Sequence, residues 1–206
     1  MTIRAALLDM DGTLFDAKID WLALRSEIRI PWDGRAILVQ LEDASEDVHT
    51  EGLALLQDAE RRGAEGGQLM HGAEELLASL RRNGVRCALV TNNSRQSVDT
   101  VLGRFPLVFD LILTRDDGPA KPDPTAFVRA LDALGVEPGE AVAIGDAHLD
   151  LIAAHRAGIG EIILVGTPPW MQSHIPSEAE YHEAADLNEV RRLVERLLAD
   201  GSKGPG

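Results

Sequence analysis

The segment LLDMDGTLF, residues 7–15, places two aspartates, Asp9 and Asp11, directly after a short apolar run. Burying a carboxylate without a partner is costly, and two carboxylates so close together also repel each other. In an extended chain, residues i and i+2 point to the same side, so both side chains can face one space beyond the end of a strand. Gly12 then permits a sharp change of chain direction. Taken alone, the pattern is also typical of a turn rich in Asp and Gly.

The rest of the chain alternates between strand-like and helix-like segments. Short apolar runs occur at 3–8, 85–90, 111–113, 141–144 and 161–165. Helices are expected over 72–84, 124–135, 149–158 and 185–201, several of them bounded by proline or glycine. This alternation predicts an α/β fold with a Rossmann-like parallel sheet covered on both faces. The tail, 201–206, is expected to be disordered.

Residues 16–71 interrupt the alternation, because they contain helix-period segments and no clear strand. The pattern predicts a small α-helical module, residues 16–71, inserted into a sheet domain made of residues 1–15 and 72–200. The large apolar residues expected to form the module's own core, or alternatively to line a substrate lid, are Trp21, Leu22, Leu24 and Trp32. The basic residues of such a module are usually solvated, but a substrate with a second anionic group would require one to turn inward; they are Lys18, Arg25, Arg29 and Arg35.

Composition limits the classes of partner. The 206 residues carry a formal net charge of −14, which argues against a nucleic-acid partner because phosphate backbones bind basic surfaces. No apolar run approaches the roughly 20 residues of a membrane span. The start of the chain lacks a secretory signal pattern, so a cytoplasmic location is expected. The single cysteine, Cys87, lies in an apolar run and is expected to be a buried, inert thiol.

Polar side chains follow the other predicted strands. Thr91 and Asn92 end the second strand, Lys121 follows the third, and Asp146 and Asp150 follow the fourth. Ligands of parallel α/β sheets bind beyond the carboxyl ends of the strands, so these side chains are expected to meet Asp9 and Asp11 in one pocket. The carboxylates there repel each other unless a cation neutralises them, and hard oxygen ligands favour Mg²⁺. A phosphate ester would complete its coordination.

These motifs together resemble the haloacid dehalogenase-like hydrolase superfamily. The resemblance rests on DMDGTL, Thr91-Asn92, Lys121-Pro122 and Gly145-Asp146 with the further acid Asp150, and it spans about Ile3 to Val165. The inserted helices are similar to the small cap of the phosphoglycolate-phosphatase-like branch. The resemblance implies a sheet with strand order 3-2-1-4-5 and a Mg²⁺-dependent phosphatase acting on a small phosphorylated metabolite. Phosphoglycolate is a candidate substrate on the strength of the cap type alone.

The resemblance also implies roles for individual residues. Asp9 would be the nucleophile that forms an aspartyl-phosphate, and Asp11 the acid and base that serves both steps. Mg²⁺ would be held by Asp9, by the backbone carbonyl of Asp11 and by Asp146, with Asp150 as an outer, supporting ligand. The residues expected to bind the phosphoryl oxygens are Gly12, Thr91, Asn92 and Lys121. Asp11 favours phosphate chemistry, because relatives that displace halide typically lack this second aspartate.

Two other functions stay open at this point. A phosphomutase of the β-phosphoglucomutase kind shares the nucleophile and the acid but passes the phosphoryl group to a second hydroxyl. A non-catalytic phosphate-binding protein could retain the same pocket. His148, which lies inside the fourth motif, is expected to be a loop or helix-start residue, with direct participation as the alternative.

Overall fold

A six-stranded parallel sheet forms the centre of the computed structural model, which describes residues 2–201. Its strands are β1 (Ala5–Leu8), β4 (Arg86–Val90), β5 (Leu111–Leu113), β6 (Ala141–Gly145), β7 (Glu161–Val165) and β8 (His182–Ala184). They are arranged in the order β5-β4-β1-β6-β7-β8. The five predicted strands therefore have the order 3-2-1-4-5, which confirms the predicted fold. The sixth, β8, was not predicted, because two of its three residues are exposed and it forms no apolar run.

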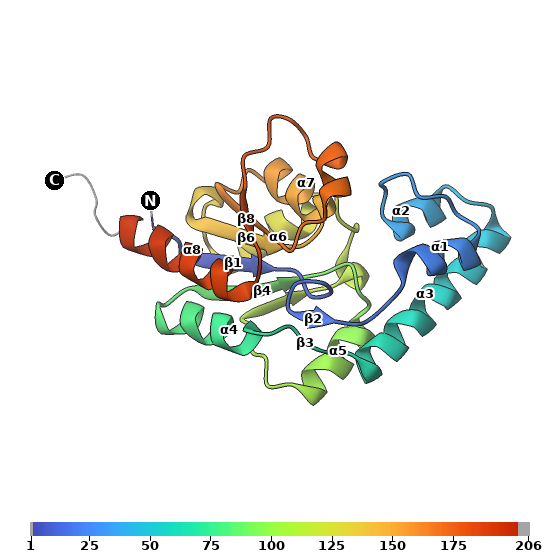
Figure 1. The fold of residues 1–206 in the computed structure, drawn as a ribbon, viewed down its shortest axis with the longest axis horizontal. Coiled ribbons are helices and arrows are strands. Elements are labelled where there is room, and N and C mark those ends of the chain that lie inside the picture. The colour runs from blue at the N-terminus through green and yellow to red at the C-terminus, as the bar shows by residue number, and fades with distance from the viewer. Residues whose placement is uncertain (1, 202–206) are drawn as a thin grey trace.

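Helices cover both faces of the sheet (Figure 1). One face packs against α4 (Ala73–Arg82), α5 (Arg95–Arg104) and α8 (Leu187–Gly201), and the other against α6 (Thr125–Leu134) and α7 (His148–Arg156). The central strand β1 serves both cores, since Ala6 and Leu8 face the first group of helices and Ala5 and Leu7 the second. This explains why the segment before Asp9 is apolar without alternation. A helix-like segment was expected after the apolar run 85–90, but the bounds of α5 were not predicted.

Three further helices lie beside the sheet, at the right of Figure 1. They are α1 (Trp21–Ile28), α2 (Ile37–Glu42) and α3 (Glu46–Gly66). The chain leaves the sheet through β2 (Phe15–Asp16) and returns through β3 (Gln68–Leu69), and these two strands pair antiparallel. We call residues 16–71 the helical insert. Its own small core contains Leu24, Ile28, Ile37, Leu41 and Leu56.

The core predicted for the helical insert was partly wrong. Leu24 is buried, but Trp21, Leu22 and Trp32 are 37%, 65% and 42% exposed. Leu24 and Ile28, one helical turn apart, fill the inner face of α1. Trp21 and Leu22 at the start of α1, and Trp32 in the loop after it, line a cavity instead.

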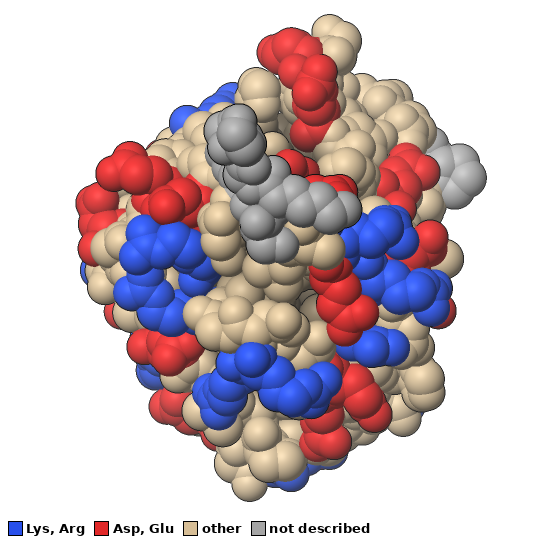
Figure 2. Space-filling view, turned by 90° about the vertical axis from the view of Figure 1, so that its left-hand side faces the viewer, with Lys and Arg blue, Asp and Glu red and all other residues tan. Residues whose placement is uncertain are grey.

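Short 3₁₀ helices complete the fold at Arg115–Asp117, Pro138–Glu140 and Pro169–His174. The predicted disordered tail lies outside the described residues, apart from Gly201, which ends α8. Figure 2 shows Lys and Arg interspersed with Asp and Glu on the face of the molecule that lies at the left of Figure 1. Within residues 2–201, none of the helices combines the length and the apolar character needed to cross a membrane.

Candidate active site

The carboxyl ends of three neighbouring strands bring the predicted polar residues together. Asp9 directly follows β1, Thr91 follows β4 and Asp146 follows β6, and β1 lies between the other two strands. The backbone N–H of Asp9 donates to the carbonyl of Ile144 at 2.9 Å, which extends the pairing of β1 and β6 up to the site. Asp150 joins them from the first turn of α7. We call these residues, with Asp11 and Lys121, the floor of the site.

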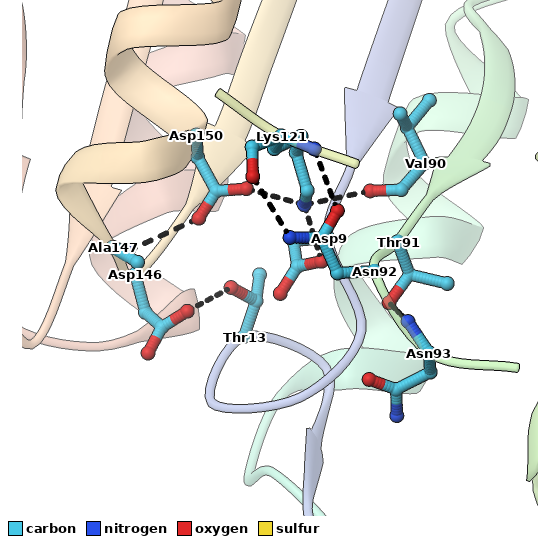
Figure 3. Close-up of polar contacts among 10 residues, drawn as sticks. All are labelled: Asp9, Thr13, Val90, Thr91, Asn92, Asn93, Lys121, Asp146, Ala147 and Asp150. Carbon is cyan, nitrogen blue, oxygen red and sulfur yellow. Dashed lines mark hydrogen bonds and ion pairs between the residues drawn. The ribbon is translucent and has the colours of Figure 1, made fainter. Parts of the chain in front are cut away.

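Lys121 connects the two sides of the floor (Figure 3). Its Nζ lies 2.6 Å from Asp9 Oδ1 and 2.5 Å from Asp150 Oδ1, and it also donates to the carbonyl of Val90 at 2.9 Å. Burial alone would lower the pKa of this lysine, but the Asp150 and Asp9 carboxylates outweigh that effect and raise it. Lys121 is therefore a permanent positive charge beside Asp9.

The floor carries more negative charge than one lysine can neutralise. Burial raises the pKa of Asp9 to about 6 against the opposing effect of Lys121. Burial and then the charge of Asp150 raise the pKa of Asp146 well above its usual value. Carboxylate oxygens of Asp9, Asp146 and Asp150 all lie within 4.8 Å of one another. This arrangement fits a small divalent cation, because hard oxygen ligands held this close are the coordination that such ions prefer.

Asp11 has a different environment from the other acids. Its Oδ1 accepts a hydrogen bond from the backbone N–H of Ala17 at 3.0 Å, where the chain enters the helical insert. Burial raises the pKa of Asp11 to about 7, against the effect of the Ala17 hydrogen bond, and the negative charge of Asp9 contributes. A carboxyl group with a pKa near neutrality can both donate and accept a proton, as acid–base catalysis requires.

The turn after Asp11 is shaped around Asp146. Gly12 has φ of +84°, and a Cβ at that position would lie 2.1 Å from Asp146 Oδ2. Thr13 is fully buried, and its hydroxyl donates to Asp146 Oδ1 at 3.4 Å. Thr13 had no predicted role, although it lies within the DMDGTL motif. Gly12 therefore allows the close approach of Asp146, and Thr13 orients it.

The residues after β4 support the floor in two ways. Thr91 is buried, and its Oγ1 accepts a hydrogen bond from the backbone N–H of Asn93 at 3.2 Å. The Asn92 side chain donates to the carbonyl of Lys121 at 3.1 Å and accepts from its N–H at 2.8 Å. Asn92 therefore uses its side chain to hold Lys121 in place. Any contact of Asn92 with phosphate would then fall to its backbone N–H.

A cavity of about 460 Å³ lies between the floor and the helical insert. On the side of the helical insert, we call six of the lining residues the roof: Trp21, Leu22, Arg25, Trp32, Ile37 and Leu38. Small-molecule sites typically have volumes of roughly 300–1,000 Å³, mostly apolar walls and a few convergent polar groups. The cavity therefore has the size and composition of a substrate site.

Comparison with known proteins identifies the family. Residues 3–158 match the family model described as haloacid dehalogenase-like hydrolase. The chain belongs to this family. It is 31% identical to a validoxylamine A 7'-phosphate phosphatase of Streptomyces hygroscopicus subsp. limoneus, over 91% of this chain and 96% of that protein. It is 32% identical to phosphoglycolate phosphatase 1 of Pseudomonas aeruginosa, over 76% of this chain and 67% of that protein.

Solved structures show the same fold. A hydrolase from Pseudomonas syringae superimposes with a TM-score of 0.77 at 20% identity, covering 94% of this chain and 98% of that one. The family model and the two phosphatase relatives confirm the predicted family and the prediction of an enzyme.

Two further polar residues, Arg35 and His148, line the cavity of this haloacid dehalogenase-like hydrolase. Arg25 and Arg35 reach it from the helical insert, whereas the other two basic candidates, Lys18 and Arg29, do not. His148 is buried, and its Nε2 lies 2.6 Å from the carbonyl of Gly34 in the helical insert. His148 therefore contacts the helical insert from the start of α7.

Glu60 of α3 is a cavity residue that sequence analysis missed. It is 2% exposed, forms a buried ion pair with Arg115 and accepts a hydrogen bond from the backbone N–H of Ser94 at 3.3 Å. Burial raises its pKa, and Arg115 opposes that effect. Glu60 thus joins the helical insert to the sheet domain beside the floor. In the sequence it is one of many acids on a helix, and nothing marks it out.

Proposed function

We propose that this hydrolase is a Mg²⁺-dependent phosphatase that cleaves a small phosphate monoester through an aspartyl-phosphate on Asp9. One observation carries the proposal. The Asp9 carboxylate lies on the floor of the substrate-sized cavity and accepts a hydrogen bond from the Lys121 ammonium. Its oxygen lies within 4.8 Å of carboxylate oxygens of Asp146 and Asp150. A carboxylate in these surroundings can attack phosphorus without a base to activate it.

Asp9 and Asp11 would share the two chemical steps. A carboxylate oxygen of Asp9 attacks phosphorus, the bond from phosphorus to the ester oxygen breaks, and Asp11 gives its proton to the departing alkoxide. A water molecule then attacks the same phosphorus, Asp11 takes the proton of that water, and the bond from phosphorus to Asp9 breaks. Inorganic phosphate leaves, and both aspartates return to their initial states. The raised pKa of Asp11 suits both of its tasks.

Positive charge and hydrogen-bond donors would stabilise the phosphoryl group during transfer. Lys121 supplies a fixed charge, and Thr91 with the nearby backbone N–H groups, including that of Gly12, supplies donors. Mg²⁺ would be held by Asp9, the Asp11 backbone carbonyl and Asp146, with Asp150 supporting, and would add positive charge where the phosphoryl oxygens bind. Asp150 is suited to support, because its Oδ1 binds Lys121 and its Oδ2 accepts from the N–H of Ala147 at 3.1 Å.

We further propose that the helical insert acts as the cap over a core formed by residues 1–15 and 72–200. Two contacts between the helical insert and the core support this role. The backbone N–H of Ala17 donates a hydrogen bond to Asp11, and Glu60 forms an ion pair with Arg115 at the edge of the floor. A cap in that position would exclude bulk water and select the leaving group. The phosphatases among the relatives are named for different substrates, so a phosphate ester is their common feature, and phosphoglycolate is one candidate. A cytoplasmic location and the absence of a nucleic-acid partner stay predictions from the sequence.

The test is release of inorganic phosphate from a panel of phosphorylated metabolites with Mg²⁺ and, in parallel, with excess chelator. We expect turnover that needs the metal and falls by more than about a thousandfold in Asp9→Asn, since this change removes the nucleophile. Asp99→Asn, an exposed acid on α5, is the matched control and should keep full activity. An isomeric phosphate ester formed without phosphate release would show a mutase, and phosphate binding without turnover would show a non-catalytic protein.

A further inference from the structure

The roof exposes large apolar side chains to the cavity. Five large hydrophobic residues are notably exposed among the described residues, and three of them, Trp21, Leu22 and Trp32, line this one cavity. The other two, Val108 and Val128, do not line it. Exposed apolar groups scattered singly over a surface are ordinary, but a cluster facing a polar site marks the place where a ligand buries them.

The roof also contains a buried cation with no counterion. Arg25 is 6% exposed, and its guanidinium donates to the carbonyl of Arg35 at 2.7 Å and to the side chain of Gln40. Its Cζ lies 4.9 Å from the centre of the Trp32 ring. Within residues 2–201, no carboxylate forms an ion pair with Arg25. Asp33, whose charge acts on it from further away, is paired with Arg35 at 2.7 Å.

One donor of Arg25 remains unused. Its Nε is buried and has no hydrogen-bond partner among the residues that the structure describes. Burial lowers the pKa of Arg25, with Asp33 opposing. A buried charge without a counterion is costly, and an anionic ligand group beside the guanidinium would offset that cost. Because Arg25 lines the cavity, that ligand group would approach from the substrate side.

We propose that the alcohol part of the substrate has a ring-sized apolar body, which packs against Trp21, Leu22 and Trp32, and an anionic group, which pairs with Arg25. This inference rests on the proposed phosphatase function. Phosphoglycolate satisfies only half of it, because its two-carbon acid has an anionic group but no apolar body to cover the tryptophans. The roof therefore favours a carboxylated, or otherwise anionic, phosphate ester with a planar or cyclic body.

A series of phosphate esters with alkyl-type leaving oxygens separates the two features. Ethyl phosphate has neither, benzyl phosphate has the apolar body, 3- and 4-carboxybenzyl phosphate have both, and phosphoglycolate has only the anionic group. We expect kcat/KM to rise about tenfold from ethyl to benzyl phosphate through apolar burial. A further rise of about tenfold is expected for the better carboxybenzyl ester through the ion pair.

Variants of the roof assign each gain to a residue. Arg25→Met should abolish the gain from the carboxylate while leaving the gain from the benzyl group, and Arg25→Lys should restore part of it. Trp32→Leu should abolish most of the gain from the benzyl group. Arg29→Met is the matched control, because Arg29 lies just after the same helix but is exposed and paired with Glu51 away from the cavity. It should change neither gain.

Binding of the non-hydrolysable phosphonates, measured by calorimetry with Mg²⁺, separates failure of the inference from failure of the proposed function. Tighter binding of carboxybenzylphosphonate than of ethylphosphonate, lost in Arg25→Met, would support the inference even if no ester were hydrolysed. Absence of hydrolysis would contradict only the phosphatase proposal. Equal rates and equal affinities across the series, or a preference unchanged in both Arg25→Met and Trp32→Leu, would overturn the inference.

Discussion

The floor and the roof of the cavity are built in opposite ways. The floor consists mainly of charged side chains that are buried or half-buried, and short hydrogen bonds fix Lys121 between Asp9 and Asp150. The roof combines large apolar side chains that stay partly exposed, such as Trp32 at 42%, with one buried cation, Arg25. A floor of this kind can perform one reaction on one chemical group. A roof of this kind can be altered to accept different alcohols without disturbing the floor.

Substitution of Lys121, a floor residue, is expected to have the largest effect on kcat/KM. In Lys121→Met, the buried carboxylates of Asp9 and Asp150 lose their shared cation, and phosphoryl transfer loses a fixed positive charge. We expect kcat/KM to fall about a thousandfold for every ester, whatever its alcohol. Steady-state kinetics across the ester series measures this. Lys18→Met changes an exposed lysine of the helical insert and should have no comparable effect. If Lys121→Met lowered kcat/KM for one ester only, the separation of the floor from the choice of alcohol would be contradicted.

Glu60 tests the connection between the two regions. Glu60→Gln would leave Arg115 as an unpaired, buried cation at the boundary between the helical insert and the sheet domain. We expect the free energy of unfolding to fall by about 3 kcal/mol, because removing one partner of a buried ion pair leaves the other charge buried without compensation. Chemical denaturation measures it. The matched change Glu51→Gln breaks only an exposed pair with Arg29 and should cost less than about 1 kcal/mol.

The pH dependence should report the floor alone. Asp11 must hold a proton when the ester bond breaks, and its pKa is raised to about 7, so kcat/KM should fall above about pH 7 as that proton is lost. Asp9 must be ionised to attack, and its pKa is raised to about 6, so kcat/KM should also fall below about pH 6. Each limb should approach about a tenfold change per pH unit. A profile that stays flat from pH 5 to pH 9 would contradict the assignment of these two aspartates.

The smallest effect on kcat/KM is expected when a roof residue is changed and the ester has no apolar body for the roof to bind. Trp32→Leu should change kcat/KM for ethyl phosphate by less than about threefold, because that ester has too little apolar surface to use the ring. The same assay with Trp21→Leu is the companion measurement. A loss as large as that of Lys121→Met would show that the roof takes part in the chemistry itself, and the two regions would no longer be separable.

The same difference explains what the sequence could predict. Asp9, Thr91 and Asp146 each follow an apolar strand directly, and parallel strands end at one edge, so local pattern and sheet geometry suffice to bring them together. The order of the five main strands was predictable through the family resemblance. The edge strand β8 was not, because its exposed residues form no apolar run.

The roof residues, and the contacts between the helical insert and the sheet domain, could not be predicted from local pattern and sheet geometry. The exposure of Trp21 and Trp32 to the cavity depends on how the helical insert lies over the floor, and helical periodicity does not contain that information. The role of Glu60 depends on its ion pair with Arg115, which lies 55 positions away in the chain. Thr13 lies inside a recognised motif, but its contact with Asp146 crosses 133 positions. Contacts between separate elements decide these roles, and a single sequence gives no measure of them.

The central claim is that Asp9 itself accepts the phosphoryl group. It is tested most directly by mixing the enzyme with a reactive phosphate ester and Mg²⁺, quenching in acid within a single turnover, and mapping phosphorylated peptides by mass spectrometry. The account predicts one phosphoryl group, on the peptide that contains Asp9, and borohydride reduction should convert that residue to homoserine. A phosphoryl group found on any other residue would contradict it.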